Sequence, residues 1–153
     1  MIIRADEHVS PFIVAAIRDI AIRDGWEITS IHEVGDSGSS DVHWITNFAN
    51  EGGHAILTAD KDFVILEPQI NAVFDTGLKV IHLPPKWGNF KGYLQAAHIL
   101  QWWDRIELTL EAMSSRECYR PPWNIKETGE LKKVDINFSK AQKKRKRKSK
   151  RQK

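Results

Sequence analysis

Hydrophobic and polar residues follow two different periods along the chain, and the two periods predict strands and helices in turn. Short apolar runs, bounded by turn-forming or charged residues, are typical of β-strands. They lie over 1–5, 26–31, 55–59 and 78–83. Between them, apolar residues recur at the spacing of one helix face. These helical patterns cover 10–25, 40–51, 68–75 and 93–113, and one further strand is expected near 134–138.

The alternation of strand and helix predicts the fold class. Such a chain forms a mostly parallel sheet that is covered on both faces by helices, with right-handed crossovers. We therefore expect an α/β fold, a three-layer α/β/α sandwich around a sheet of four to five strands. Strand orders 3-2-1-4 and 2-1-3-4 both fit the pattern, and the second would place strands one and three side by side.

Acidic residues follow two of the predicted strands. Asp6 and Glu7 come directly after strand one, Asp60 and Asp62 come after strand three, and Asp41 opens the helix that follows strand two. The carboxyl ends of parallel strands form the usual ligand crevice of an open α/β sheet. Carboxylates gathered there repel one another, and a hard cation with a preference for oxygen ligands relieves the repulsion. The pattern therefore predicts a site for Mg²⁺ or Mn²⁺.

Each acid also has a purely structural interpretation. Asp41 is well placed to cap a helix, which for a single Asp after Gly-Ser-Ser is the favoured reading, and Glu7 is well placed to interact with a helix dipole. Asp60 and Asp62 suit a turn. These structural readings explain each acid separately but are less convincing for all of them together, because the acids follow two strand ends at one predicted edge of the sheet. The six histidines show no spacing typical of zinc ligands, and no phosphate-binding glycine loop is present.

The charge of the chain is divided unevenly. Of the 23 Lys and Arg residues, ten lie in 140–153, a segment without acids, so 1–139 holds 13 basic and 20 acidic residues and a net charge of −7. We expect one domain over 1–139 and a disordered basic tail over 140–153, because such a charge block repels itself and buries nothing apolar. The tail either captures nucleic acid or an acidic partner through its charge, or serves only as a solubilising segment. The candidate nucleic-acid-binding residues are Lys143, Lys144, Arg145, Lys146, Arg147 and Lys148.

Composition also bears on the compartment. No apolar run approaches the ~20 residues that span a bilayer, no secretory signal is apparent at the N-terminus, and Cys118 is the single cysteine. These features predict a cytoplasmic protein without a membrane partner. The adjacent Trp102 and Trp103 face different sides of a helix, so one is expected in the core and the other at an exposed surface.

Three blocks of sequence, in this order, resemble the compact PIN-like nucleases. They are Ile3 to Pro11 (IRADEHVSP), Gly38 to Ile45 (GSSDVHWI) and Leu57 to Phe63 (LTADKDF). Within that group the chain is most similar to the VapC-type toxins of toxin–antitoxin pairs. The resemblance covers about residues 1–83. Relatives often carry Glu directly after the helix-opening Asp, whereas this chain has Val42, so one outer ligand is in doubt.

The resemblance implies a PIN-like α/β/α fold and a ribonuclease that uses Mg²⁺ or Mn²⁺ to hydrolyse RNA phosphodiesters. It also implies inhibition by a cognate antitoxin protein, and it leaves a homodimer open. Carried over by motif, the acids of the family fall on Asp6, Asp41, Asp60 and Asp62 as catalytic residues. Asp6, Asp60 and Asp41 are the expected metal ligands, and Asp62 is the weaker candidate for direct coordination.

Three neighbouring residues are candidates for supporting roles in that site. Glu7 adjoins the first acid, Thr58 is placed to hydrogen-bond an acid or a metal-bound water, and Lys61 is placed to contact a phosphate. A Lys between two acids is equally compatible with a solvated neighbour.

Two other classes of function share some of these features. A phosphoacceptor signalling domain also has acids at the ends of strands one and three, but it needs a Ser or Thr at the end of the next strand and a Lys at the end of a fifth. Here the fourth strand runs into Leu83-Pro84-Pro85. A non-catalytic module that binds RNA or protein through the basic tail is the third class.

Overall fold

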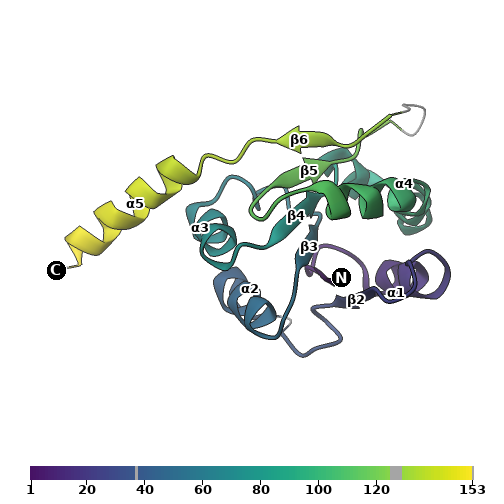
Figure 1. The fold of residues 1–153 in the computed structure, drawn as a ribbon, viewed down its shortest axis with the longest axis horizontal. Coiled ribbons are helices and arrows are strands. Elements are labelled where there is room, and N and C mark those ends of the chain that lie inside the picture. Colours follow the sequence, from purple (N-terminus) through teal and green to yellow (C-terminus); the bar gives the residue numbers. More distant parts are fainter. Residues whose placement is uncertain (37, 125–128, 153) are drawn as a thin grey trace.

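The computed structural model describes residues 1–36, 38–124 and 129–152, and it shows a sheet between two layers of helices (Figure 1). The strands are β1 (Ile2–Ala5), β2 (Glu27–Ser30), β3 (Ala55–Thr58), β4 (Lys79–His82), β5 (Cys118–Arg120) and β6 (Lys132–Val134). The helices are α1 (Pro11–Ile20), α2 (Asp41–Asn50), α3 (Glu67–Thr76), the 3-10 helix η1 (Pro85–Asn89), α4 (Gly92–Ala112) and α5 (Phe138–Arg151). The expected α/β/α sandwich is confirmed, but the sheet has six strands among the described residues rather than the expected four to five.

The sheet has the order β2-β1-β3-β4-β5-β6, and only the last pair of neighbours is antiparallel. The first four strands therefore follow the order 2-1-3-4, one of the two that the sequence allowed. In register, Ala5 of β1 lies opposite Leu57 of β3, and Thr58 of β3 lies opposite His82 of β4. The carboxyl ends of β1, β3 and β4 are therefore neighbours at one edge of the sheet.

Alternating strand residues supply two separate cores, one on each face of the sheet. Ala5, Leu57 and Ile81 pack against α1 and α4 on one face. Ile56 and Val80 pack against α2 and α3 on the other. Figure 1 shows the same division, with α1 and α4 on one side of the strands and α2 and α3 on the opposite side. Because both faces are covered, the site has to lie at an edge of the sheet rather than on a face.

Serine side chains begin the two helices that flank the acids. Ser10 Oγ accepts a hydrogen bond from the Phe12 amide at 3.2 Å, and Ser40 Oγ accepts one from the His43 amide at 3.3 Å. Ser40 is therefore the N-cap of α2, and Asp41 is the first helical residue. The carboxylate of Asp41 does not serve as the N-cap, so the structural reading of this acid that the sequence favoured is wrong.

Helix α1 is shorter than its sequence pattern predicts. It ends at Ile20, whereas the apolar spacing extends towards Gly25. The amide of Arg23 instead donates to the buried carboxylate of Glu107 in α4, at 2.8 Å. A tertiary hydrogen bond therefore replaces the helical one, and the chain turns towards β2.

The second half of the chain departs most from the sequence predictions. Strand β5 was not predicted, and β6 lies slightly before the expected position. Trp102 and Trp103 are both buried, although one of them was expected at the surface. The reason is that α4 contacts α1, η1 and β4, so neighbouring elements cover more than one of its sides.

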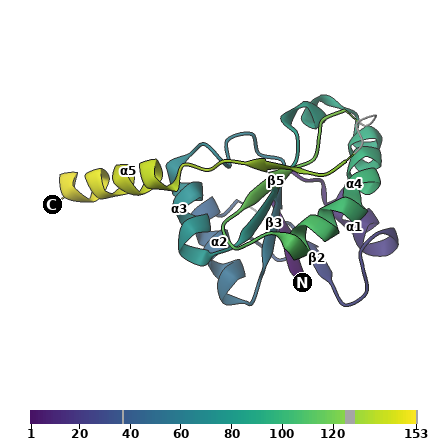
Figure 2. The same cartoon turned by 45° about the horizontal axis from the view of Figure 1, so that its top comes forward.

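The basic segment also differs from the expected disordered tail. It forms α5, which lies beside α3 and extends away from the body of the molecule (Figures 1 and 2). Acidic side chains of α3 neutralise part of its charge: Arg145 pairs with Asp75 at 2.7 Å, and Lys148 pairs with Glu67 at 2.8 Å. Lys153, the last residue of the predicted tail, lies outside the described residues.

Among the described residues, no helix combines the length and the apolarity that a membrane crossing requires.

Candidate functional site

The carboxylate of Asp6 lies at the end of β1, where it is almost completely buried, with 2% of its surface exposed. Its Oδ1 accepts a hydrogen bond from the His8 amide at 3.1 Å, and its Oδ2 accepts a short one from the hydroxyl of Thr58. The Asp6 amide donates to the Leu57 carbonyl at 3.0 Å. Asp6 is thus held against the end of β3 by both its backbone and its side chain.

Thr58 connects this first acid to the second. The hydroxyl that donates to Asp6 also accepts a hydrogen bond from the Asp60 amide, at 3.1 Å. Asp60 Oδ1 in turn accepts one from the Asp62 amide at 2.9 Å. The acids that follow β1 and β3 therefore belong to one hydrogen-bonded network, and one oxygen of Asp60 also stabilises the turn after the strand.

Burial has a clear electrostatic consequence for Asp6. Desolvation raises the pKa of its carboxyl to about 6, against the smaller lowering effects of the Thr58 hydrogen bond and of His8. Ionisation of Asp6 therefore costs free energy when no cation is bound beside it. A cation at this position would favour the ionised form and offset that cost.

Two histidines lie beside the second acid. His8 is half exposed, with its Nε2 3.7 Å from Asp60 Oδ2. His82, at the end of β4, is fully buried, and its Nε2 donates to the Asp60 carbonyl at 2.8 Å. Arg120 of β5 donates to His82 Nδ1 from Nε and Nη2, at 2.9 and 2.7 Å. Burial lowers the pKa of His82, which fits a neutral ring that holds the backbone of Asp60.

Sequence reasoning missed the roles of His82 and Arg120, because it considered the histidines only as zinc ligands. The apolar run of β4 ends at His82 as that of β3 ends near Asp60, which was a usable signal. No comparable signal existed for Arg120, since β5 was not predicted.

Asp41 is bound into a different set of contacts. Its Oδ1 accepts a hydrogen bond from Trp44 Nε1 at 3.0 Å, and its Oδ2 accepts one from Gln69 Nε2 of α3 at 2.7 Å. Both carboxylate oxygens therefore have protein donors, and the contact with Gln69 joins α2 to α3. Its role as a metal ligand stays a prediction.

A hollow of about 290 Å³ opens over the second acid, lined by His8, Ala59, Asp60, Lys61, Asp62 and Pro85. Lys61 is exposed and lines the hollow, whereas Glu7 is exposed without lining it. Asp60 and Asp62 are each partly exposed, so solvent and a ligand can reach this edge of the sheet. The acids that the sequence placed after β3 thus border an accessible cavity.

The donor atoms at this edge are oxygens, the kind of ligand that a hard divalent cation prefers. Across residues 1–36, 38–124 and 129–152, no group of three or more His, Cys, Asp or Glu side chains is arranged to hold a metal. Asp6 and Asp60 supply carboxylate oxygens, and Thr58 links the two residues. Mg²⁺ commonly binds through one or two carboxylates together with waters and substrate phosphates. Two carboxylates therefore match the number of protein ligands that such a site uses.

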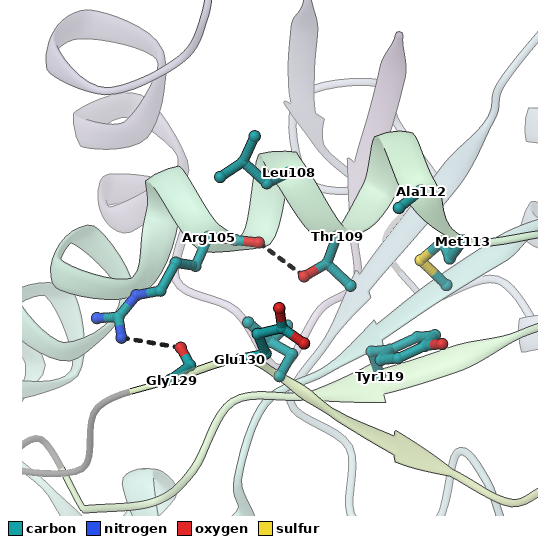
Figure 3. Close-up of a pocket in the computed structure, with 9 residues that line it drawn as sticks. Arg105, Leu108, Thr109, Ala112, Met113, Tyr119, Gly129 and Glu130 are labelled. Carbon is teal, nitrogen blue, oxygen red and sulfur yellow. Dashed lines mark hydrogen bonds between the residues drawn. The ribbon is translucent and has the colours of Figure 1, made fainter.

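A separate hollow of about 270 Å³ lies between α4 and the segment that leads into β6 (Figure 3). Arg105 donates to the Gly129 carbonyl at 3.2 Å, and Thr109 donates to the Arg105 carbonyl at 2.7 Å. Among the described residues that line it, Glu130 is the one acid. This hollow therefore lacks the paired carboxylates of the edge formed by β1 and β3.

Comparison with known proteins identifies the domain. A family described as "PIN like domain" matches residues 1–85, which is more than half of the chain and contains Asp6, Asp41, Asp60 and Asp62. No curated protein and no solved structure matches the chain. The matched segment includes β1 to β4 in the order 2-1-3-4 and the hydrogen-bonded acids at their carboxyl ends. The chain therefore belongs to the PIN-like domain family.

Proposed function

We propose that this protein is a metal-dependent endoribonuclease that hydrolyses RNA phosphodiesters. The observation that carries the proposal is the buried Asp6, which Thr58 joins to the Asp60 turn at the open edge of the sheet. PIN-like domains are commonly nucleases and generally use divalent metals. A buried carboxylate with a raised pKa, beside a second acid in an accessible hollow, is the kind of group that binds such a cation.

In this proposal each residue of the network has a definite task. Asp6 and Asp60 hold Mg²⁺ or Mn²⁺ directly, while Asp41 and Asp62 complete the site directly or through water. A cation bound there would activate a water and would stabilise charge on the phosphate. Thr58 fixes the Asp6 carboxylate, and His82 fixes the backbone of Asp60.

Two further groups complete the arrangement at the mouth of the hollow. Lys61 supplies a positive charge for a phosphate, since its side chain is exposed there. His8 lies against Asp60 Oδ2 and limits the directions from which a ligand can reach that oxygen.

Removal of the metal is the direct test of this function. The full-length protein is expected to cleave RNA in the presence of Mg²⁺ or Mn²⁺ and to lose that cleavage when EDTA is in excess. Gel analysis of total RNA measures both conditions, and restoring an excess of the metal over EDTA is expected to restore the cleavage. Cleavage of equal extent in EDTA would rule out the metal-dependent mechanism.

A phosphoacceptor domain is less well supported than a nuclease. Such a domain needs a hydroxyl residue at the end of the strand next to β3, and β4 ends at His82. Both ring nitrogens of His82 are engaged, one by the Asp60 carbonyl and the other by Arg120. Asp6 is also almost completely buried.

The narrower proposal is that the nuclease is the toxin of a type II toxin–antitoxin pair. It rests on the resemblance of the three sequence blocks to VapC-type toxins. A neighbouring reading frame for a small DNA-binding protein, whose product relieves growth inhibition by this chain, would support it. The absence of growth inhibition on expression would count against it.

Helix α5 provides a second contact with RNA in this proposal. Arg145 and Lys148 are paired with α3, whereas Lys143, Lys144, Lys146 and Arg147 are exposed on the same helix. Exposed cations attract the phosphate backbone without regard to sequence.

Replacing those four exposed cations by Gln is therefore expected to weaken RNA binding and to lower its salt dependence. On a single strand the log–log slope falls by about 0.7 for each phosphate that the protein no longer neutralises. The two ion pairs to α3 are kept, so the helix keeps its attachment. Titrations at several salt concentrations in EDTA measure the slope. An unchanged slope would leave α5 with a solubilising role only.

A further inference from the structure

A groove of about 380 Å³ lies next to the acidic hollow, and most of its lining residues come from the part of the chain beyond the PIN-like match. Among the residues that line it are Lys86, Arg120, Trp123, Lys132 and Lys133. Among the described residues that line it, none is acidic, although 1–139 as a whole carries a net negative charge. The groove is therefore a local basic surface on an acidic domain.

The groove and the acidic hollow meet at one residue. Pro85, the first residue of η1, lines both cavities. Arg120 provides a second connection, because it lines the groove and also donates to His82, which holds the Asp60 carbonyl. A polymer that reaches the acids after β3 can therefore continue over Pro85 into the groove.

Trp123 gives the groove an aromatic surface in a fixed position. Its backbone carbonyl accepts a hydrogen bond from Trp87 Nε1 at 2.8 Å, and Trp87 is buried. The Nζ of Lys86 lies 4.0 Å from the centre of the Trp123 ring. Trp123 nevertheless keeps 48% of its surface exposed. The Trp123 ring is exposed, its backbone is fixed by a hydrogen bond, and the Lys86 ammonium lies beside it. Such a site suits a flat ligand that also carries negative charge.

The remaining cations differ in how far they are already neutralised. Lys133 forms an ion pair with Glu117 at 2.9 Å, and Arg120 is directed at His82. Lys86 and Lys132 are exposed along the groove. These two residues are therefore the ones best placed to meet phosphates.

We propose that this groove binds a single-stranded RNA segment adjoining the bond that is cleaved, with a base stacked on Trp123 and phosphates beside Lys86 and Lys132. This inference rests on the proposed nuclease function for the choice of RNA. Proteins that bind single strands combine a basic groove with aromatic side chains in this way. A duplex keeps its bases stacked on one another, so it offers no base face to Trp123.

Binding measured without cleavage tests the proposal. The probe is a fluorescent single-stranded RNA of about 10 nucleotides, a length within the range that one such groove covers, titrated with full-length protein in EDTA. Trp123→Ala is expected to weaken binding roughly tenfold or more, as the loss of one base–aromatic stack does. Trp123→Phe keeps an aromatic face and is expected to retain most of the affinity. The same RNA as a duplex is expected to bind Trp123→Ala and wild type equally.

Two further variants separate stacking from other effects. Tyr93→Ala removes an aromatic residue of α4 that is 69% exposed and lies outside the groove, and it is expected to bind single-stranded RNA like wild type. Lys132→Gln is expected to lower the salt-dependence slope by about 0.7, the value for one neutralised phosphate on a single strand. Circular dichroism of each variant confirms that the fold is unchanged.

The result that would overturn the proposal is single-stranded RNA binding that is equally tight in wild type, Trp123→Ala and Lys132→Gln. Dependence on Trp123 for a fluorescent acidic peptide, but not for RNA, would assign the groove to a polypeptide and also overturn it. The nuclease function can fail separately. If no metal supports cleavage while Trp123→Ala still weakens RNA binding, the result supports RNA binding in the groove and refutes the catalytic proposal.

Discussion

Asp6→Asn is expected to reduce metal-dependent RNA cleavage by about 100- to 1,000-fold, because a metal ligand contributes several kcal/mol to stabilising the transition state. The substitution keeps the shape of the side chain and can preserve the hydrogen bond from the His8 amide. It removes the negative charge that would hold the cation. Cleavage rates of a labelled RNA at saturating Mg²⁺ measure the effect.

Asp19→Asn is the matched control for that experiment. It makes the same chemical change at an exposed position of α1, so its cleavage rate is expected to equal that of wild type. Wild-type cleavage by a correctly folded Asp6→Asn protein would remove Asp6 from the mechanism and with it the main support for the proposed function.

Asp6→Asn is also expected to stabilise the metal-free protein above pH 6, by about 1 to 3 kcal/mol. Burial raises the pKa of the Asp6 carboxyl from its ordinary value to about 6, so the folded state binds this proton more tightly than the unfolded state does. The wild-type free energy of unfolding therefore falls as pH rises from about 4 to about 6, and the full penalty remains above that range. Asn carries no charge and avoids the penalty.

Urea unfolding in EDTA across this pH range measures the difference between the two proteins. It is expected to be small below about pH 4 and to reach a plateau above the raised pKa. Thr58→Val serves as a contrast, because it keeps the Asp6 charge but removes the hydroxyl that donates to it, and this variant is expected to be less stable than wild type. An Asp6→Asn protein that is less stable than wild type above pH 6 would contradict the prediction.

The features of the fold that the sequence predicted best are those fixed by local pattern. Strands β1 and β3 end just before Asp6 and Asp60, where their apolar runs stop, and the helices expected from residues 10 and 40 begin at the side-chain caps Ser10 and Ser40. The choice of strand order 2-1-3-4 over its rival depends on which strands pair, and no local signal carries that information.

The features that the sequence missed depend on contacts between distant residues. Asp41 is held by Gln69, 28 residues away, and His82 is held by Arg120, 38 residues away. Trp102 and Trp103 are both buried because several elements cover α4, which helical spacing alone does not reveal. The basic segment pairs with acids of α3. Its charge pattern alone could not reveal these partners, so it predicted a disordered tail.

The hydrogen bond between Asp6 and Thr58 joins residues that are 52 positions apart, and it sets the order in which this protein can acquire its acidic network during synthesis. Asp6 is made first, but its partner and the Asp60 turn appear only after α1, β2 and α2 have been made. β3 must then insert beside β1, on the side opposite β2, before the two acids meet. A nascent chain that stops before Thr58 therefore carries the first acid without the site.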